Sequence, residues 1–249
     1  MALIVHQFPC LSDNYGFLVR DAATGKVATV DTPDADAILA ELGKLGWSLD
    51  MILNTHWHPD HAGGNAALKT ATGAEIVGPA EVTRIAPLDK ALVDGDVVML
   101  GETRFEVIDT GGHTLGHISY HDAKNAIAFV GDTLFALGCG RLFEGTAEQM
   151  WASLQRLTDL PDATTVYCAH EYTASNARFA LSVDTAPAVT ERADAVFAAR
   201  ERGEPTVPTS IGAEKATNPF LRAPLLRPDA PSPAEAFAEI RAAKDGFKG

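Results

Sequence analysis

The chain is poor in cysteine and contains no long hydrophobic run. Its three cysteines, Cys10, Cys139 and Cys168, are a weak basis for a disulfide framework in 249 residues, and none forms a C-x-x-C pair of the kind found in zinc ribbons. No apolar stretch approaches the ~18 residues that a transmembrane helix needs, and the first residues lack the basic and apolar segments of a secretion signal. We therefore expect a cytoplasmic protein whose thiols take no part in the chemistry.

Basic residues are also scarce. The 20 Lys and Arg stand against 33 Asp and Glu, which gives a formal net charge of -13. A surface with this charge repels nucleic acids and anionic membranes at long range. Over residues 218–249, however, basic residues exceed acidic ones by one. The sequence therefore favours a small anionic ligand over nucleic acid or a membrane as the partner.

The first two thirds of the chain alternate β-rich runs with helical patterns, which indicates a layered α/β fold. Helical spacing is seen at 35–45 and 62–71. The β-rich runs lie at residues 3–8, 15–20, 27–32, 51–55, 75–77, 97–100, 104–108, 126–130 and 165–168. No strand is expected after His170, where helical patterns take over at 174–183 and 188–202. We therefore predict an α/β domain over residues 1–170 and a helical domain over 171–249.

The last helix has a recognisable start. Ser232, Pro233 and Glu235 supply the N-cap, the first-turn proline and the capping-box acid. Further along this helix, Arg241 and Lys244 are three residues apart, so they lie side by side on its surface. This pair is where an anionic ligand is expected to bind.

Four potential metal ligands lie within the six residues HWHPDH at 56–61, directly after a β-rich run. Residues two apart at a strand end point the same way, so His56 and His58 reach one ion. Asp60 and His61, past the proline turn, face a second ion. Imidazole and carboxylate suit zinc, iron or manganese, and the lack of a thiolate argues against a closed structural zinc site. The cluster therefore predicts a catalytic centre with two divalent ions, zinc first and iron or manganese as alternatives.

Two ions need more ligands than this segment supplies. His113, Asp132 and His170 each terminate a further apolar strand, and strand ends place polar side chains at the rim of a sheet. A metal pair about 3.5 to 4 Å apart is best held by a shared carboxylate, for which Asp132 is the candidate. Of the remaining histidines, we expect His117 to support a ligand and the others to be structural.

With these motifs the chain resembles the metallo-β-lactamase superfamily and, within it, the glyoxalase II (hydroxyacylglutathione hydrolase) family. The motifs shared with the superfamily are THWHPDHAGG, GGHTLGH and FVGDTLF. Those typical of the narrower family are DNYGFLV, GCGRLFEGT, CAHEYTASNARFA, TVPTSIGAEKATNPFLR and RAAKDGFK. The resemblance implies an αββα metallo-β-lactamase-like sandwich followed by a small α-helical C-terminal domain that binds glutathione.

The same resemblance implies the reaction and its metal ligands. The thioester S-D-lactoylglutathione, or a related 2-hydroxyacyl-glutathione, is hydrolysed by a metal-bridging hydroxide to D-lactate and glutathione, the second step of methylglyoxal detoxification. The implied ligands are His56, His58 and His113 on one ion, Asp60, His61 and His170 on the other, and Asp132 as the bridge. Asp60 and Asp132 are thus the expected catalytic residues, with Asp60 also orienting the attacking water. We expect the enzyme to be a monomer.

The residues implied to hold glutathione are Arg141, Phe143, Tyr172, Arg241 and Lys244. Arg141 and Phe143 stand where eukaryotic members have Lys and Tyr; Arg141 keeps the charge, whereas Phe143 lacks the hydroxyl donor. Two other interpretations remain open: a glutathione persulfide dioxygenase with one iron, and a non-catalytic module that the metal only stabilises.

Overall fold

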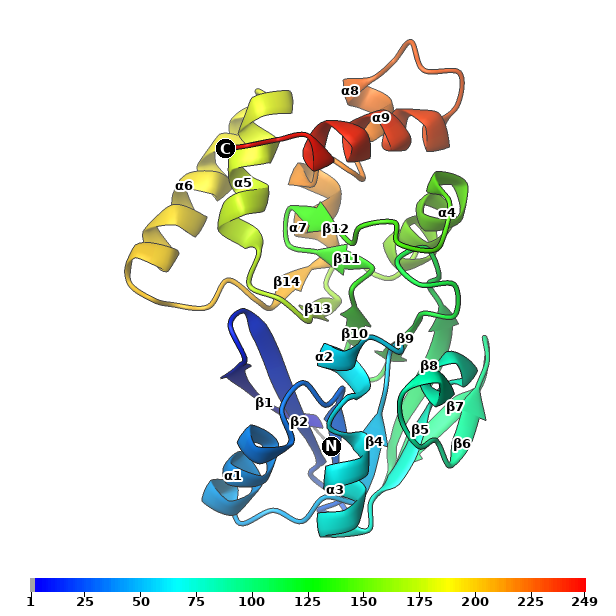
Figure 1. Ribbon diagram of the computed structural model, residues 1–249. Helices are drawn as coiled ribbons and strands as arrows, with labels where there is room; N and C mark the ends of the chain where they lie inside the picture. The colour runs from blue at the N-terminus through cyan, green and yellow to red at the C-terminus, as the bar shows by residue number, and fades with distance from the viewer. Residues whose placement is uncertain (1–2) are drawn as a thin grey trace. The chain divides into compact units, whose positions relative to one another are not determined.

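The computed structural model describes residues 3–249 (Figure 1). Its chain contacts form two compact units, and each is treated by itself. Unit 1 comprises the chain up to Asp109 together with Gly116–Gly131, and unit 2 comprises Thr110–Leu115 and Asp132–Gly249. The boundary expected at residue 170 stays a prediction. Among the described residues, no helix has the length and apolar character needed to cross a membrane.

Unit 1 contains a six-stranded sheet in which the strands lie side by side in the order of the sequence. Its strands are β1 (Leu3–Cys10), β2 (Asn14–Asp21), β3 (Val27–Val30), β4 (Met51–Leu53), β5 (Glu75–Pro79) and β6 (Lys90–Leu92). The pairs among β1, β2 and β3 are antiparallel, whereas β3 to β6 pair in parallel. Parallel strands require crossover connections. These are α1 (Ala35–Leu45), the short α2 (Pro59–Ala62) with α3 (Asn65–Thr72), and the 3₁₀ turn Ala80–Arg84.

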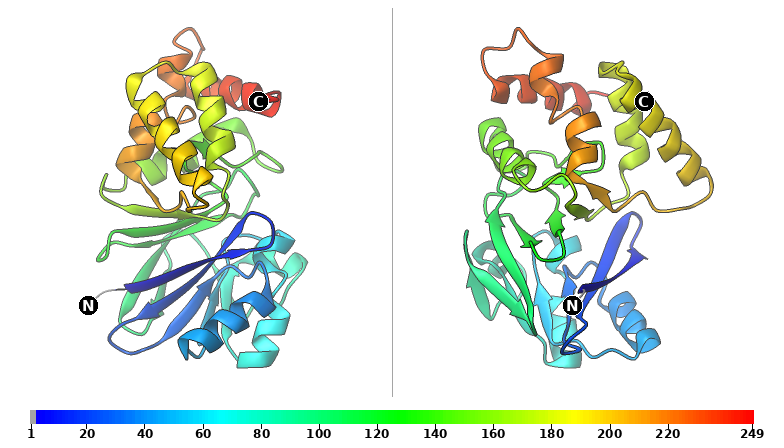
Figure 2. Two further views of the ribbon diagram at one scale, coloured as in Figure 1. Left: turned by 90° about the vertical axis from the view of Figure 1, so that its left-hand side faces the viewer. Right: turned by 180° about the vertical axis from the view of Figure 1, so that it is seen from behind.

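Helix α1 shows why this part of the chain folds as expected. Its N-cap Asp34 accepts hydrogen bonds from the first-turn amides, and Gly46 ends the helix at a φ of 65°, a conformation that glycine adopts without strain. Its inner residues Ile38 and Leu42 pack with Leu68 of α3 in one apolar core beneath the sheet. Figures 1 and 2 show both helices along the sheet.

A second set of strands completes unit 1. These strands pair antiparallel in sequence order, as β7 (Val97–Leu100), β8 (Thr103–Asp109), β9 (Ile118–Asp122) and β10 (Ile127–Gly131). The rings of Phe17 in β2 and Phe129 in β10 meet at 5.7 Å, and the Tyr120 hydroxyl donates to the Asn54 carbonyl at 2.7 Å. The two sets of strands therefore enclose an aromatic core. Strand β9 was not expected from the sequence, and its polar residues are buried together with its apolar ones.

Unit 2 is mainly helical. Its elements are β11 (Leu134–Phe135), β12 (Gly138–Cys139), α4 (Ala147–Thr158), β13 (Thr165–Cys168), α5 (Thr173–Val183), α6 (Pro187–Glu201), β14 (Thr209–Ser210), α7 (Ile211–Thr217), α8 (Ala223–Leu226) and α9 (Pro233–Asp245). The expectation that no strand follows His170 is wrong, since β14 pairs antiparallel with β13. This strand has only two residues, too few to produce a pattern. At the start of α9 the Ser232 side chain accepts from the Glu235 amide, which confirms the expected cap.

Candidate active site

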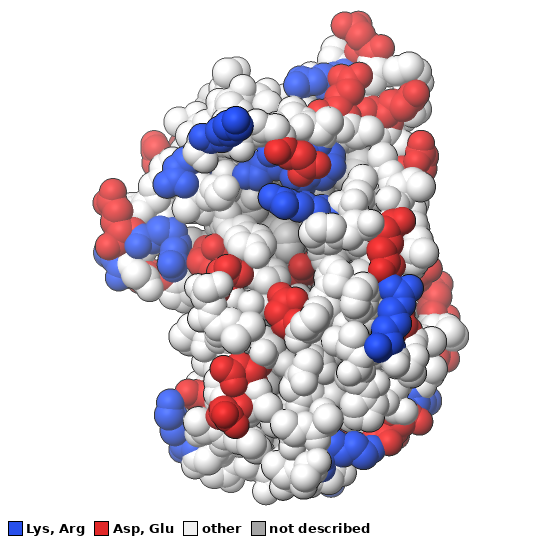
Figure 3. Space-filling view, viewed as in Figure 1, with Lys and Arg blue, Asp and Glu red and all other residues white. Residues whose placement is uncertain are grey.

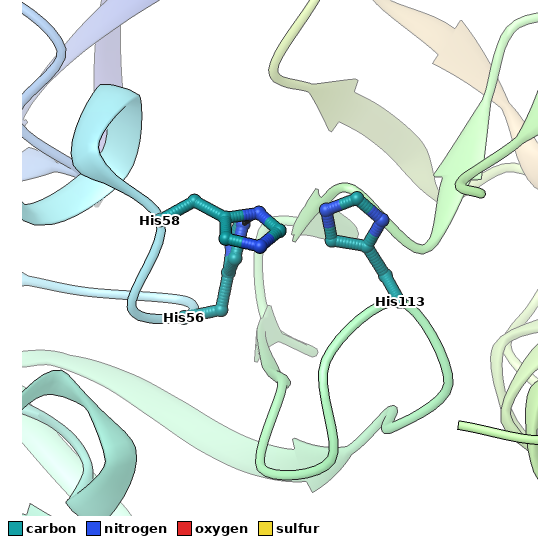
Figure 4. A group of neighbouring side chains, drawn as sticks. All are labelled: His56, His58 and His113. Carbon is teal, nitrogen blue, oxygen red and sulfur yellow. Dashed lines mark hydrogen bonds between the residues drawn. The ribbon is translucent and has the colours of Figure 1, made fainter. Parts of the chain in front are cut away.

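Four of the expected metal ligands follow β4 in unit 1. Nε2 of His56 lies 3.0 Å from Nδ1 of His58, and Figure 4 shows the two side chains on the segment after the strand. Nε2 of His61 lies 3.4 Å from Oδ2 of Asp60. The ring of His61 is tilted by 45° against that of His56, with ring centroids 4.0 Å apart. The segment therefore gathers three imidazoles and one carboxylate within unit 1.

Asp31, at the end of β3, supports this cluster and was not recognised from the sequence. Its Oδ2 atom lies 2.8 Å from Nδ1 of His61, and its carboxylate accepts hydrogen bonds of 2.8 Å from both the amide and the hydroxyl of Thr55. A carboxylate on Nδ1 fixes the ring orientation and presents Nε2 as the ligand atom. The available signal was an acid that terminates an apolar strand, the same signal that pointed to Asp132.

Three further contacts orient the metal-ligand candidates of unit 1. The Thr55 hydroxyl lies 3.1 Å from Nδ1 of His56, and the ring of His117 stacks on that of His56 at 4.9 Å. Nδ2 of Asn14 donates to Oδ2 of Asp60 at 3.0 Å. Neighbours of this kind hold the rings and the carboxylate in place before any ligand binds.

Unit 2 brings together the other three expected ligands, all of them buried. Oδ2 of Asp132 lies 3.3 Å from Nε2 of His113, and Oδ1 lies 3.3 Å from Nε2 of His170. Figure 4 shows His113 on the loop after β8, where its Nδ1 lies 2.9 Å from the Arg141 carbonyl oxygen to which it donates. The two oxygens of one carboxylate thus face two different imidazoles, as a bridging ligand requires.

The spacing of these atoms fits divalent metal ions. Two ligands at about 2.0–2.1 Å from a tetrahedral ion lie roughly 3.4 Å from each other. The separations of 3.3 Å in unit 2 and of 3.4 Å between Asp60 and His61 agree with this value. Imidazole and carboxylate donors without a thiolate suit zinc, iron or manganese. The described residues therefore include His and Asp groups suited to binding a metal.

A pocket of about 420 Å³ lies next to the unit 2 ligands and includes His113 and Asp132 in its lining. Its lining also includes every residue that was expected to contact glutathione: Arg141, Phe143, Tyr172, Arg241 and Lys244. These residues come from the segment after β12, from the start of α5 and from α9. One pocket of unit 2 is thus lined by metal-ligand candidates and by basic side chains.

The pocket concentrates positive charge. Arg241 is only 5% exposed; its guanidinium donates to the Cys139 carbonyl at 3.1 Å and to Asp245 at 2.8 Å, while its Nε has no hydrogen-bond partner among residues 3–249. Burial, and then repulsion by Arg241 and Arg141, lowers the pKa of Lys244 from 10.5 to about 8. Figure 3 shows basic side chains gathered over the part of unit 2 that holds α5 and α9. Such a pocket is suited to an anion.

Aromatic rings flank the ligand end of this pocket. The ring of Tyr172 lies flat against that of His170, with centroids 4.7 Å apart and an interplanar angle of 2°. Phe143 is 63% exposed, and its ring centroid is 5.2 Å from that of His113. The Phe143 amide donates to the His113 carbonyl at 3.3 Å, so this N–H is already engaged within the protein.

The cysteines are poorly suited to act as nucleophiles. All three are buried, and burial raises the pKa of Cys10 and Cys168 to about 12 and that of Cys139 to about 11. Because the thiolate is the reactive form, these side chains are inert near neutral pH.

Family comparisons fit this arrangement. Residues 21–170 match the model of the metallo-beta-lactamase superfamily, and residues 171–247 match that of the hydroxyacylglutathione hydrolase C-terminus. Among solved structures, ETHE1 from Myxococcus xanthus superposes with a TM-score of 0.71 at 30% identity, covering 96% of this chain and 90% of that one. The structure of TTHA1623 in a di-iron-bound form gives 0.62 at 26% identity, covering 88% and 100%. The fold and the metal-binding groups thus define a metallo-β-lactamase-type protein with a helical C-terminal domain, as expected.

Curated relatives narrow this class. A hydroxyacylglutathione hydrolase of Maricaulis maris is 55% identical over 98% of this chain and 99% of the relative. Another, of Erythrobacter litoralis, is 52% identical over 98% and 100%. This chain belongs to the hydroxyacylglutathione hydrolase family of the metallo-β-lactamase superfamily.

Proposed function

We propose that this protein hydrolyses S-D-lactoylglutathione and related 2-hydroxyacyl-glutathiones to the free 2-hydroxy acid and glutathione. The observation that carries the proposal is the pocket of unit 2, whose lining combines His113 and Asp132 with the cations Arg141, Arg241 and Lys244. Its volume of about 420 Å³ lies within the range of small-molecule sites, roughly 300–1,000 Å³. Membership of the hydroxyacylglutathione hydrolase family supports the same class of substrate.

We assign the metal ligands as the sequence motifs suggest, for a pair of divalent ions. His56, His58 and His113 would hold one ion, Asp60, His61 and His170 would hold the other, and Asp132 would be a ligand of both. When bound, such a pair supplies an activated water at neutral pH and stabilises negative charge on the attacked carbonyl oxygen. The reaction then needs no nucleophilic side chain, which accords with three inert thiols.

The other residues bind and orient the substrate. Glutathione carries two carboxylates and one ammonium, and the cations Arg241 and Lys244 in the pocket lining are suited to a carboxylate. Tyr172, stacked on His170, forms an apolar wall beside the thioester. Asp60, positioned by Asn14, orients the attacking water. Contacts with the unreacting glutathione part fix the carbonyl at the Asp132 end of the pocket.

A steady-state assay on S-D-lactoylglutathione, paired with elemental analysis of the same preparation, tests the proposal. We expect chelator-sensitive loss of the thioester and two divalent ions per chain. His113→Ala should lose metal and turnover together. His6→Ala should keep both, because His6 contacts Glu41 in unit 1 instead of any proposed ligand. Metal-loaded protein that leaves the thioester intact, or that consumes oxygen with glutathione persulfide on a single iron, would overturn the proposal.

Zinc as the metal, a monomeric state and a cytoplasmic location belong to the same proposal. Elemental analysis, light scattering after size exclusion, and cell fractionation test them in turn.

A further inference from the structure

Lys244 lies against two contacting phenyl rings, those of Phe179 and Phe247. Its Nζ lies 5.5 Å from the ring centroid of Phe179 and 5.6 Å from that of Phe247, distances at which the negative face of a ring attracts an ammonium. The carbonyl and the hydroxyl oxygen of Ser175 each accept a hydrogen bond of 3.0 Å from Nζ. Since an ammonium has three N–H donors, one is left for a ligand.

Arg241, a second basic residue of the pocket lining, also contacts an aromatic ring. The guanidinium carbon of Arg241 lies 4.8 Å from the ring centroid of Phe220. The ring of Phe220 is 5.8 Å from that of Phe179, which in turn meets Phe247 at 5.5 Å. Phe220, Phe179 and Phe247 thus form a continuous aromatic wall behind both cations.

Lys244 needs such support because its neighbours are mostly of like charge. Arg241 on α9, Arg141 after β12 and Arg178 on α5 repel its ammonium, whereas Asp245 on α9 attracts it. A long, flexible side chain in this position would otherwise turn towards solvent. Contact with two ring faces lowers the energy of the ammonium where it lies.

We propose that Phe247 is a positioning residue for glutathione binding, which holds the Lys244 ammonium at the pocket by completing the aromatic wall. The inference rests on the proposed function. Phe247 lies beyond the end of α9, where its amide donates to the Lys244 carbonyl at 3.1 Å. Phe179 is 1% exposed and belongs to the core, whereas Phe247 is only partly buried. Phe247 can therefore be changed without opening a cavity in the core.

The test compares variants that keep or remove the ring. Phe247→Leu keeps an apolar side chain without the ring, and we expect the KM for S-D-lactoylglutathione and the Kd for S-methylglutathione to rise about threefold to tenfold, the effect of one half-buried cation–π contact. The kcat should stay unchanged, since Phe247 does not touch the reacting atoms. Phe247→Trp should restore both constants. Phe197→Leu is the matched control, because Phe197 contacts Arg178 at 5.8 Å outside the pocket lining, and it should change neither.

A double-mutant cycle separates positioning from general stability. In a Lys244→Met background, Phe247→Leu should have no further effect on Kd, because the ammonium that it positions is gone. An equal loss in both backgrounds, a Phe247→Trp variant as weak as Phe247→Leu, or a parallel fall in kcat would overturn the inference. Wild-type protein that neither binds S-methylglutathione nor hydrolyses the thioester would instead overturn the proposed function.

Discussion

The pKa of Lys244 makes substrate capture depend on pH within an accessible range. Burial comes first among the causes that lower this pKa from 10.5 to about 8, followed by the charges of Arg241 and Arg141. A carboxylate binds the protonated form of Lys244. We therefore predict that affinity for a glutathione derivative falls as the pH rises through about 8.

The size of the effect follows from the contact. A hydrogen bond to a charged group contributes about 1.5–3 kcal/mol, and because Lys244 is only half-buried, screening by solvent favours the lower end, or about tenfold in affinity. One pH unit above the pKa, roughly a tenth of the Lys244 side chains remain protonated. The Kd should then rise about fivefold between pH 7 and pH 9. The bound carboxylate raises the pKa, so binding takes up protons above about pH 8.

Isothermal titration with S-methylglutathione at pH 7, 8 and 9, in buffers of different ionisation enthalpy, measures the Kd and the number of protons taken up on binding. This ligand has no free thiol, so only its amino group titrates in the range. Lys244→Arg is the control, because arginine keeps its charge throughout while the ligand titrates identically. A ratio of wild-type to Lys244→Arg affinity that stays constant from pH 7 to pH 9 would refute the reasoning.

Three further changes test the site itself. Asp60→Asn should retain the fold by circular dichroism and lose at least about 10²-fold in kcat; full activity with full metal loading would contradict its role. Asp31→Asn should weaken metal binding by about 10- to 100-fold in chelator competition, because His61 loses the partner of its Nδ1; unaltered affinity would show that this contact is not needed. Replacing Cys10, Cys139 and Cys168 by alanine should preserve turnover, and the native thiols should resist iodoacetamide at pH 7.5 because each has a pKa of about 11 or 12; rapid alkylation of the folded protein would be inconsistent with this.

The metal-ligand candidates were predictable because their chemistry is local. His56, His58, Asp60 and His61 lie in one short segment after a buried strand, where alternation and a proline turn decide which way each side chain points. The candidates further along the chain were predicted from the rule that strand ends place polar side chains at the rim of a sheet. In unit 2, Asp132 lies 3.3 Å from the imidazoles of both His113 and His170. The sequence located these three residues at strand ends but could not give the distances between them.

The strands that escaped prediction depend on tertiary contacts. In the β11–β12 hairpin, the side-chain amide of Asn218 donates to the carbonyls of Phe135 and Gly138 at 3.1 and 2.9 Å. Asn218 is 83 positions from Phe135 and 80 from Gly138, so no local sequence pattern contains both partners of either hydrogen bond. For Asp31 the sequence showed an acid at a strand end, but its contacts with Thr55 and His61 depend on the pairing of β3 with β4.

The spacing of Arg241 and Lys244 alone could not show that these cations line a pocket. An Arg and a Lys three apart on a helix are most often a solvated face, but Arg241 is almost fully buried and bonded to a carbonyl 102 positions away. Gathering Arg141, Arg241 and Lys244 in one pocket produces the repulsion that contributes to the lowered pKa of Lys244. A ligand with two carboxylates relieves that repulsion as it binds. Relief of repulsion therefore adds to the direct contacts, and a chain with a net charge of -13 can select a small anion at one place while the rest of its surface repels polyanions.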